Sequence, residues 1–207
     1  MNTDPVYGAK AIVAFKSYWR ELLDACQDDT LPAAGRCSVP QRRSFNPMKI
    51  HACLPHVYIT ELISDTMIEV RLSGTAIDEN AGQSLKGSNF LDMCGPAERP
   101  FHVAICHALT SCPCGVEMTR RVTLRDGRVN EYKSVSFPLA DKEGAPRFIV
   151  GIANIAEHIS FVERFEKAQQ IHSAIKDFNF IDIGVGVPSS EFIKSLKFAN
   201  EGEVSFR

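Results

Sequence analysis

Histidine and cysteine side chains gather in the middle of the chain, within a stretch of thirteen residues. These side chains are His102, Cys106, His107, Cys112 and Cys114. Imidazole and thiolate are the usual ligands of zinc, and a helix would place His102 and Cys106, four residues apart, on one face. Only one residue separates Cys112 from Cys114, however, whereas most zinc knuckles use Cys-x-x-Cys. We therefore expect no metal site, and interpret the stretch as a helix followed by a turn.

A second candidate for chemistry is the glycine-containing segment from Asp182 to Gly186. Its sequence, Asp-Ile-Gly-Val-Gly, looks like the phosphate-binding loop after the first strand of a nucleotide or S-adenosylmethionine site. Pro188 interrupts the pattern, and the roughly twenty residues that remain are too few for an α/β domain. We therefore favour a strand or loop that docks on a sheet. A small-molecule enzyme that uses this loop or the histidine–cysteine stretch is the alternative.

The charged residues show no pattern typical of a nucleophile or of nucleic-acid binding. Four carboxylates fall on predicted turns or outer strand faces, where most such side chains are solvated: Asp78, Glu79, Glu117 and Glu131. Four arginines come close together with acidic residues interleaved: Arg120, Arg121, Arg125 and Arg128. The sequence therefore predicts a protein that is not an enzyme and has no nucleic-acid partner.

The composition is that of an ordinary soluble protein. The chain has 207 residues, of which 44% are hydrophobic and 23% charged, and its net charge is −2. Its longest apolar run, Phe148 to Ala153, is far short of the ~20 residues of a membrane-spanning helix. The N-terminus lacks the basic start and apolar core of a signal peptide. We expect a cytoplasmic protein without membrane contact, whose seven cysteines are reduced thiols.

The chain begins and ends with patterns that predict helices. Near the N-terminus, apolar residues recur at spacings of three and four: Ile12, Phe15, Trp19, Leu22 and Cys26. A polar linker follows, to Pro40. A second long helix is predicted from Glu157 to about Lys176, and an extended segment from Phe178 to Val187.

Between them, short elements follow one another in a definite order. Strands are predicted at 57–63, 68–72, 116–124, 129–139 and 148–155, the third and fourth joined by an Asp-Gly hairpin turn. Short helices are predicted at 47–54 and 75–81, and a longer one at 97–109. This order predicts an α+β fold, a five-stranded antiparallel sheet with short helices on one face and flanking N- and C-terminal helices. We expect a helix and linker over 1–40, the main domain over 41–156, and a helix and tail over 157–207.

The element order and several short motifs resemble the PAS domain family. Gly82 with the segment 85–90 is similar to the glycine-then-Leu-x-Gly stretch before the long helix of that family, and 154–157 to its Asp-Ile-Thr-Glu junction. Further motifs are similar to a group of stand-alone bacterial PAS proteins: Tyr-Trp-Arg-Glu-Leu at 18–22, Phe-Asn-Pro at 45–47 with Leu-Pro-His at 54–56, and Arg-Leu-Ser-Gly-Thr at 71–75. The resemblance covers roughly residues 15 to 156.

The resemblance implies a sensory or adaptor protein that acts through ligand- or partner-dependent interaction with a downstream signalling protein. Any small-molecule cavity should lie between the middle helix and the sheet, lined by Leu72, Phe90, His102, Ile105, Phe137 and Val150. The family does not name a ligand. Some members hold haem through a histidine on the middle helix, so a haem-binding sensor using His102 or His107 is a further alternative. Because no haem or flavin motif is present, we expect no tightly bound redox cofactor.

The apolar face of the N-terminal helix also predicts an assembly. The exposed face of a PAS-like sheet needs a cover, and a few buried aromatic or leucine side chains contribute ~1.5–3 kcal/mol each. We therefore expect a homodimer, with Phe15, Trp19 and Leu22 in its interface.

Overall fold

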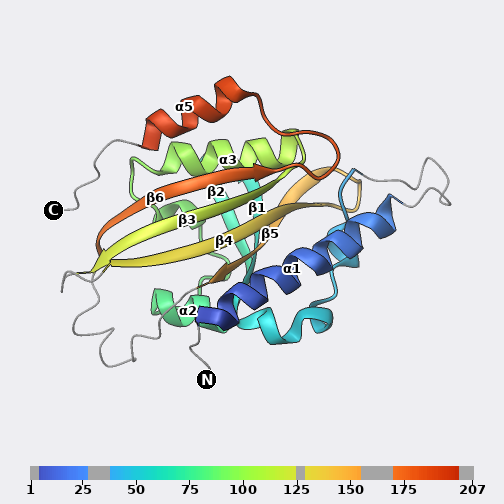
Figure 1. Cartoon of the computed structure of the whole chain (residues 1–207), viewed down its shortest axis with the longest axis horizontal. Helices are drawn as coiled ribbons and strands as arrows, with labels where there is room; N and C mark the ends of the chain where they lie inside the picture. Colours follow the sequence, from blue (N-terminus) through green and yellow to red (C-terminus); the bar gives the residue numbers. More distant parts are fainter. Residues whose placement is uncertain (1–4, 28–37, 125–128, 155–169, 201–207) are drawn as a thin grey trace.

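The computed structural model describes residues 5–27, 38–124, 129–154 and 170–200, and its centre is one antiparallel sheet of six strands (Figure 1). The strands lie in the order β2-β1-β5-β4-β3-β6. Their bounds are β1 Val57–Ser64, β2 Met67–Ser73, β3 Gly115–Leu124, β4 Val129–Ala140, β5 Pro146–Asn154 and β6 Gln170–Ile181. The first five confirm the sequence prediction, and β6 is an added strand on the outer edge of β3.

Seven helical segments accompany the sheet in the described residues. The α-helices are α1 (Pro5–Cys26), α2 (Thr75–Ala81), α3 (Arg99–Ser111) and α5 (Ser190–Asn200), and the 3₁₀ segments are η2 (Arg42–Ser44), η3 (Pro47–His56) and η4 (Phe90–Met93). Gly82 ends α2 with a positive φ of 71°, a conformation that suits glycine. No described helix is long and apolar enough to cross a bilayer.

One face of the sheet is covered by α1 and η3. Phe15, Trp19 and Leu23 of α1 are buried there, because the spacing of three and four places them on one side of the helix. The Trp19 ring stacks on Phe137 of β4, with ring centroids 4.2 Å apart and planes 14° apart. Helix α1 is therefore part of the core of the domain.

This packing corrects the role that we expected for the apolar stripe of α1. Phe15 has 0% and Trp19 has 2% of its surface exposed within a single chain, and Leu22 packs at the margin of the same cluster. The side chains expected at a dimer interface therefore cover the sheet of their own chain. The physical reason is that a long amphipathic helix can bury its apolar stripe against an uncovered face of the sheet in its own chain.

The opposite face of the sheet is covered by α3, η4 and α5. Its apolar cluster joins Phe101, Ile105 and Leu109 of α3 to Phe178 of β6 and Leu196 of α5. Helix α5 lies beside α3 and completes this layer (Figure 1).

The prediction of a helix from Glu157 to Lys176 is wrong for residues 170–176, which belong to strand β6. The rest of that helix lies outside the described residues, as do the Asp-Gly turn at 126–127 and most of the predicted linker. Residues 178–181 are extended as predicted, and α5 follows where only a tail was expected.

Candidate functional site

Three ionisable side chains meet in the layer between α3 and the sheet. Arg120 of β3 donates from Nη1 to Glu98 Oε2 at 2.8 Å and from Nη2 to His102 Nε2 at 2.8 Å. Glu98 is the residue before α3 and His102 is in its first turn, so a spacing of four places both on the side that faces β3. Only 5% of Glu98 and 6% of His102 is exposed. We call these three residues the polar cluster.

The hydrogen bonds of the polar cluster fix the protonation of its histidine. Burial, and then the neighbouring charge of Arg120, lower the pKa of His102 from 6.5 to about 3. Because an arginine can only donate, Nε2 of His102 accepts, and the imidazole proton resides on Nδ1. With a neutral histidine, the charges of Glu98 and Arg120 cancel.

One polar atom of the cluster is not satisfied. Oε1 of Glu98 is buried and has no hydrogen-bond partner among the described residues. A buried acceptor without a partner costs roughly 1–3 kcal/mol, and more when it is charged. Such an atom needs a hydrogen-bond donor, and the described part of the chain does not supply one.

Aromatic rings and thiols surround the polar cluster. Phe90 and Phe101 contact the His102 ring edge to face, with centroid distances of 5.0 and 5.5 Å. Burial raises the pKa of the Cys94 and Cys106 thiols to about 12, so both are protonated near neutral pH. A protonated thiol is neither a strong nucleophile nor a metal ligand.

The six residues expected to line one cavity are divided between the two faces of the sheet. Phe90, His102 and Ile105 lie on the α3 side, where the polar cluster is. Leu72, Phe137 and Val150 pack on the α1 side instead. Successive strand residues point to opposite faces, so Ser136 and Ile149, the neighbours of Phe137 and Val150, lie on the α3 side. Leu72 and Val70 lie on opposite faces because the bulge at Arg71 separates them. That part of the lining prediction is corrected.

Sequence reasoning missed both Glu98 and the role of Arg120. We placed Arg120 in a mixed surface patch, but it shares the inward phase of β3 with Val116 and Met118. That alternation was the available signal, together with the Glu-x-x-x-His spacing that ends at His102.

The histidine–cysteine stretch does not converge on one point. His107 Nε2 lies 2.6 Å from Asp65 Oδ1 at the β1–β2 turn, while His102 faces Arg120. Cys114 is fully buried and immediately precedes β3. Within the described residues, no three histidine, cysteine or acidic side chains are grouped so that they could hold a metal ion.

The backbone N–H groups of the glycine segment after β6 bind the aspartate of the same segment. The N–H groups of Gly184 and Gly186 donate to Asp182 Oδ1 at 2.7 and 2.9 Å. These two bonds lower the pKa of Asp182. Because backbone donors that would bind a phosphate are used by a carboxylate, the segment does not fit an anion in this arrangement.

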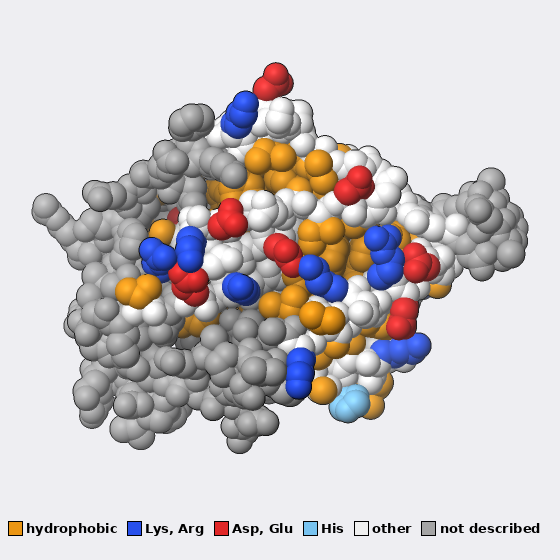
Figure 2. Space-filling model, viewed as in Figure 1, with side chains coloured by type: hydrophobic (Ala, Val, Ile, Leu, Met, Phe, Trp, Pro, Cys, Tyr) orange, Lys and Arg blue, Asp and Glu red, His pale blue; other side chains and the backbone are white. Residues whose placement is uncertain are grey.

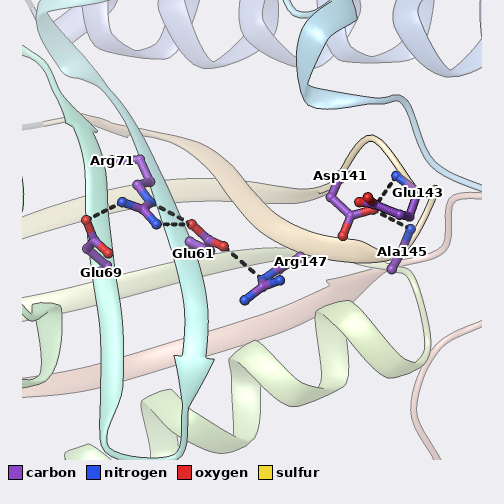
Figure 3. Close-up of polar contacts among 7 residues, drawn as sticks. All are labelled: Glu61, Glu69, Arg71, Asp141, Glu143, Ala145 and Arg147. Carbon is purple, nitrogen blue, oxygen red and sulfur yellow. Dashed lines mark hydrogen bonds and ion pairs between the residues drawn. The ribbon is translucent and has the colours of Figure 1, made fainter.

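A second buried glutamate lies at the other end of the sheet (Figure 3). Glu61 of β1 pairs with Arg71 at 2.5 Å and with Arg147 at 2.8 Å, and Arg71 also pairs with Glu69. Arg71 is the extra residue of a β-bulge between the pairs Ile59–Leu72 and Thr60–Val70. Both oxygens of Glu61 have partners, so this network is structural.

The outer surface has a hollow and a mixed distribution of charge. The hollow, of about 500 Å³, lies between α1 and η3 and is lined by Ala14, Ser17, Tyr18, Glu21 and residues 49–53. Positive and negative side chains are interleaved on the face in Figure 2, and the described part of this face has no extended patch of one sign. Glu131 pairs with both Arg121 and Lys176.

Comparison with known proteins agrees with the fold. A family model described as PAS domain matches residues 9–154. The light-state structure of the photoreceptor Aureochrome1 LOV is 17% identical with a TM-score of 0.35, over 54% of this chain and 86% of that chain. VqmA of Vibrio cholerae is 12% identical with a TM-score of 0.41, over 57% of this chain and 54% of that chain. An RNA-binding Light-Oxygen-Voltage receptor is 13% identical with a TM-score of 0.37, over 78% of this chain and 55% of that chain.

No curated protein matches the sequence. The family model, however, covers well over half of the chain and all five strands that were predicted from it. Strand β6 and helix α5 lie beyond the matched residues. The chain belongs to the PAS domain family.

Proposed function

We propose that this chain is a sensory protein that detects a small molecule at the polar cluster and passes the signal on by protein interaction. The observation that carries the proposal is the buried Oε1 of Glu98, an acceptor with no partner among the described residues. A ligand with a hydrogen-bond donor removes the cost of that unpaired atom, and this cost is a source of binding energy.

The surroundings of Glu98 define the chemistry of the ligand. Because the charges of Glu98 and Arg120 cancel and His102 is neutral, a neutral molecule fits better than an ion. The edges and faces of Phe90 and Phe101 favour a flat, largely apolar body. The ligand class is therefore a neutral, planar compound with an N–H or O–H group.

The same environment supports a signal without catalysis. His102 is a weak base, since its pKa is about 3 and its Nε2 already accepts from Arg120. The thiols of Cys94 and Cys106, with pKa values of about 12, are weak nucleophiles. We infer that binding, and not turnover, is the event at this site.

Native mass spectrometry of the freshly purified chain tests the proposal. We expect a small non-covalent mass, retained in gentle ionisation and lost after denaturation and refolding. A chain that carries no small molecule, and acquires none from a cell extract of small metabolites, would contradict the proposal.

We also propose a homodimer, through the outer face of α1 and not through its buried stripe. Val13 is 63% exposed on this face, next to the hollow between α1 and η3. Lys10 and Asp24, both exposed, lie two helical turns on either side of Ser17. An antiparallel pair of α1 helices centred on Ser17 would therefore place each lysine beside the aspartate of the other copy.

A further inference from the structure

Arg120 contributes to two parts of the fold, one with its side chain and one with its backbone. Its side chain forms the polar cluster with Glu98 and His102, and its backbone belongs to the ladder between β3 and β6. That ladder shifts register at this point, because Thr119 is opposite Asp177 whereas Arg120 is opposite Ile175. Lys176 is the extra residue. A bulge interrupts the regular hydrogen bonds of a ladder, so the pairing of β6 is irregular beside the residue that organises the cluster.

A chain of ring contacts leads from the polar cluster to the C-terminal helix. His102 contacts Phe101, and Phe101 contacts Phe178 of β6 at 5.3 Å between centroids. Phe178 then contacts Phe180 at 6.0 Å, and Phe180 contacts Phe192 of α5 at 6.5 Å. Aromatic pairs of this kind stabilise packing beyond the burial of their surface. The packing of β6 and α5 therefore depends on where Phe101 and His102 lie.

Strand β6 is also the last strand of the sheet, paired on one side with β3. The strands β1 and β5, in contrast, each have two neighbours. Elements with fewer partners open at lower free energy than the centre of a sheet. A change in the polar cluster should therefore reach β6 and α5 before it reaches β1 or β5.

We propose that β6 and α5 together form the output element of this protein, and that the contacts of Arg120 and Phe101 couple its docking to the polar cluster. The inference rests on the proposed function, since it assigns an output to the same site. When the cluster rearranges, the outer edge of β3 and the aromatic side of α3 become exposed. Within the described residues, those are the surfaces that β6 and α5 cover.

Hydrogen–deuterium exchange of the ligand-free full chain tests the coupling. Glu98→Gln keeps the shape of the side chain but removes the charge that holds Arg120. We expect the backbone amides of β6 to exchange about tenfold faster or more, which corresponds to about 1.4 kcal/mol of local opening free energy, while those of β1 and β5 stay unchanged. The matched control is Glu131→Gln, which removes the negative charge that pairs with Lys176 at the same bulge, on the opposite face of the sheet. Because the ion pairs of Glu131 are exposed, we expect the exchange rates of the β6 amides to change by about twofold at most.

Two results would overturn the coupling. One is β6 exchange in Glu98→Gln that matches the wild type, and the other is a uniform increase across β1, β5 and β6, which indicates general destabilisation. If Glu98→Gln does not fold, Phe101→Leu is measured in the same way, because Phe101 contacts both His102 and Phe178. The test needs no ligand, so a failed coupling and a failed ligand search are separate outcomes.

Discussion

The hydroxyl of Tyr58 lies 2.7 Å from the hydroxyl of Ser136, although their strands are separated by β5. The two residues are in register with Gly151 between them, and a Cβ on Gly151 would meet the Tyr58 ring at 2.4 Å. The tyrosine therefore crosses a neighbouring strand at the one position where a glycine leaves room.

We predict that Gly151→Ala destabilises the protein by about 1–3 kcal/mol, since the tyrosine ring must move and its hydrogen bond is lost. Urea unfolding measures this difference. In a Tyr58→Ala background, the same substitution should cost less than in the wild type, because no ring lies over the new methyl group. Equal costs in the two backgrounds would show that the crossing does not matter.

The stack of Trp19 on Phe137 gives a second prediction. Trp19→Ala should destabilise the chain by about 3–5 kcal/mol, as expected for a large buried aromatic residue. Val13→Ala, on the exposed face of the same helix, should change stability by less than about 0.5 kcal/mol. Thermal or urea unfolding compares them. If the two substitutions have similar effects, α1 does not pack on the sheet as described.

The outer face of α1 can be tested by a charge swap. If Lys10 meets Asp24 of a second copy, Lys10→Glu should weaken the dimer about tenfold, since two symmetric pairs become repulsive. Adding Asp24→Lys should restore the wild-type affinity. Sedimentation equilibrium follows both. A wild type that is monomeric at micromolar concentration, or a double variant as weak as the single one, argues against this interface.

The buried histidine predicts a dependence of stability on pH. The pKa of His102 is about 3 in the folded chain and near 6.5 when unfolded, so the unfolded state binds more protons between these values. The contribution of the neutral His102 to the free energy of unfolding is therefore complete above pH 6.5. It is lost as the pH falls toward 3, by about 1.4 kcal/mol per pH unit. His102→Gln should show a flatter decline in the urea midpoint over this range than the wild type. Parallel curves for the two proteins would contradict a neutral His102.

Much of the fold could be predicted because its elements have regular periods. The three-and-four spacing of Phe15 and Trp19 gave the helix, and the period of two through Val135, Phe137 and Leu139 gave the strand. The periods do not show which surface each element packs against. The apolar stripe on α1 could pack on a second copy of the chain or on the sheet of its own chain, and only the folded arrangement shows that Trp19 stacks on Phe137.

The error at β6 has a local cause. Within residues 170–176 the predicted helical stripe used Ile171 and Ile175, which are four residues apart. A spacing of four places two residues on one face of a helix, but it also does so in a regular strand, so it does not distinguish the two.

The candidate site was only half visible in the sequence. His102 and Phe90 were expected near it, but Arg120 was judged by its charge and not by its phase, and Glu98 was not considered. A charged residue at an inward strand position is buried when a partner neutralises it. That partner comes from α3, and the sequence does not show which helix residue faces which strand residue.

Retention of a bound molecule in two matched variants tests the central claim, that the ligand binds at the polar cluster. Glu98→Gln and Glu61→Gln each change one buried glutamate with arginine partners into its amide, the first in the cluster and the second in the network at the β1–β2 edge. We predict that native mass spectrometry finds the small molecule on the wild type and on Glu61→Gln, and that Glu98→Gln has lost it while remaining folded by circular dichroism. Equal occupancy in Glu98→Gln and the wild type would contradict the account.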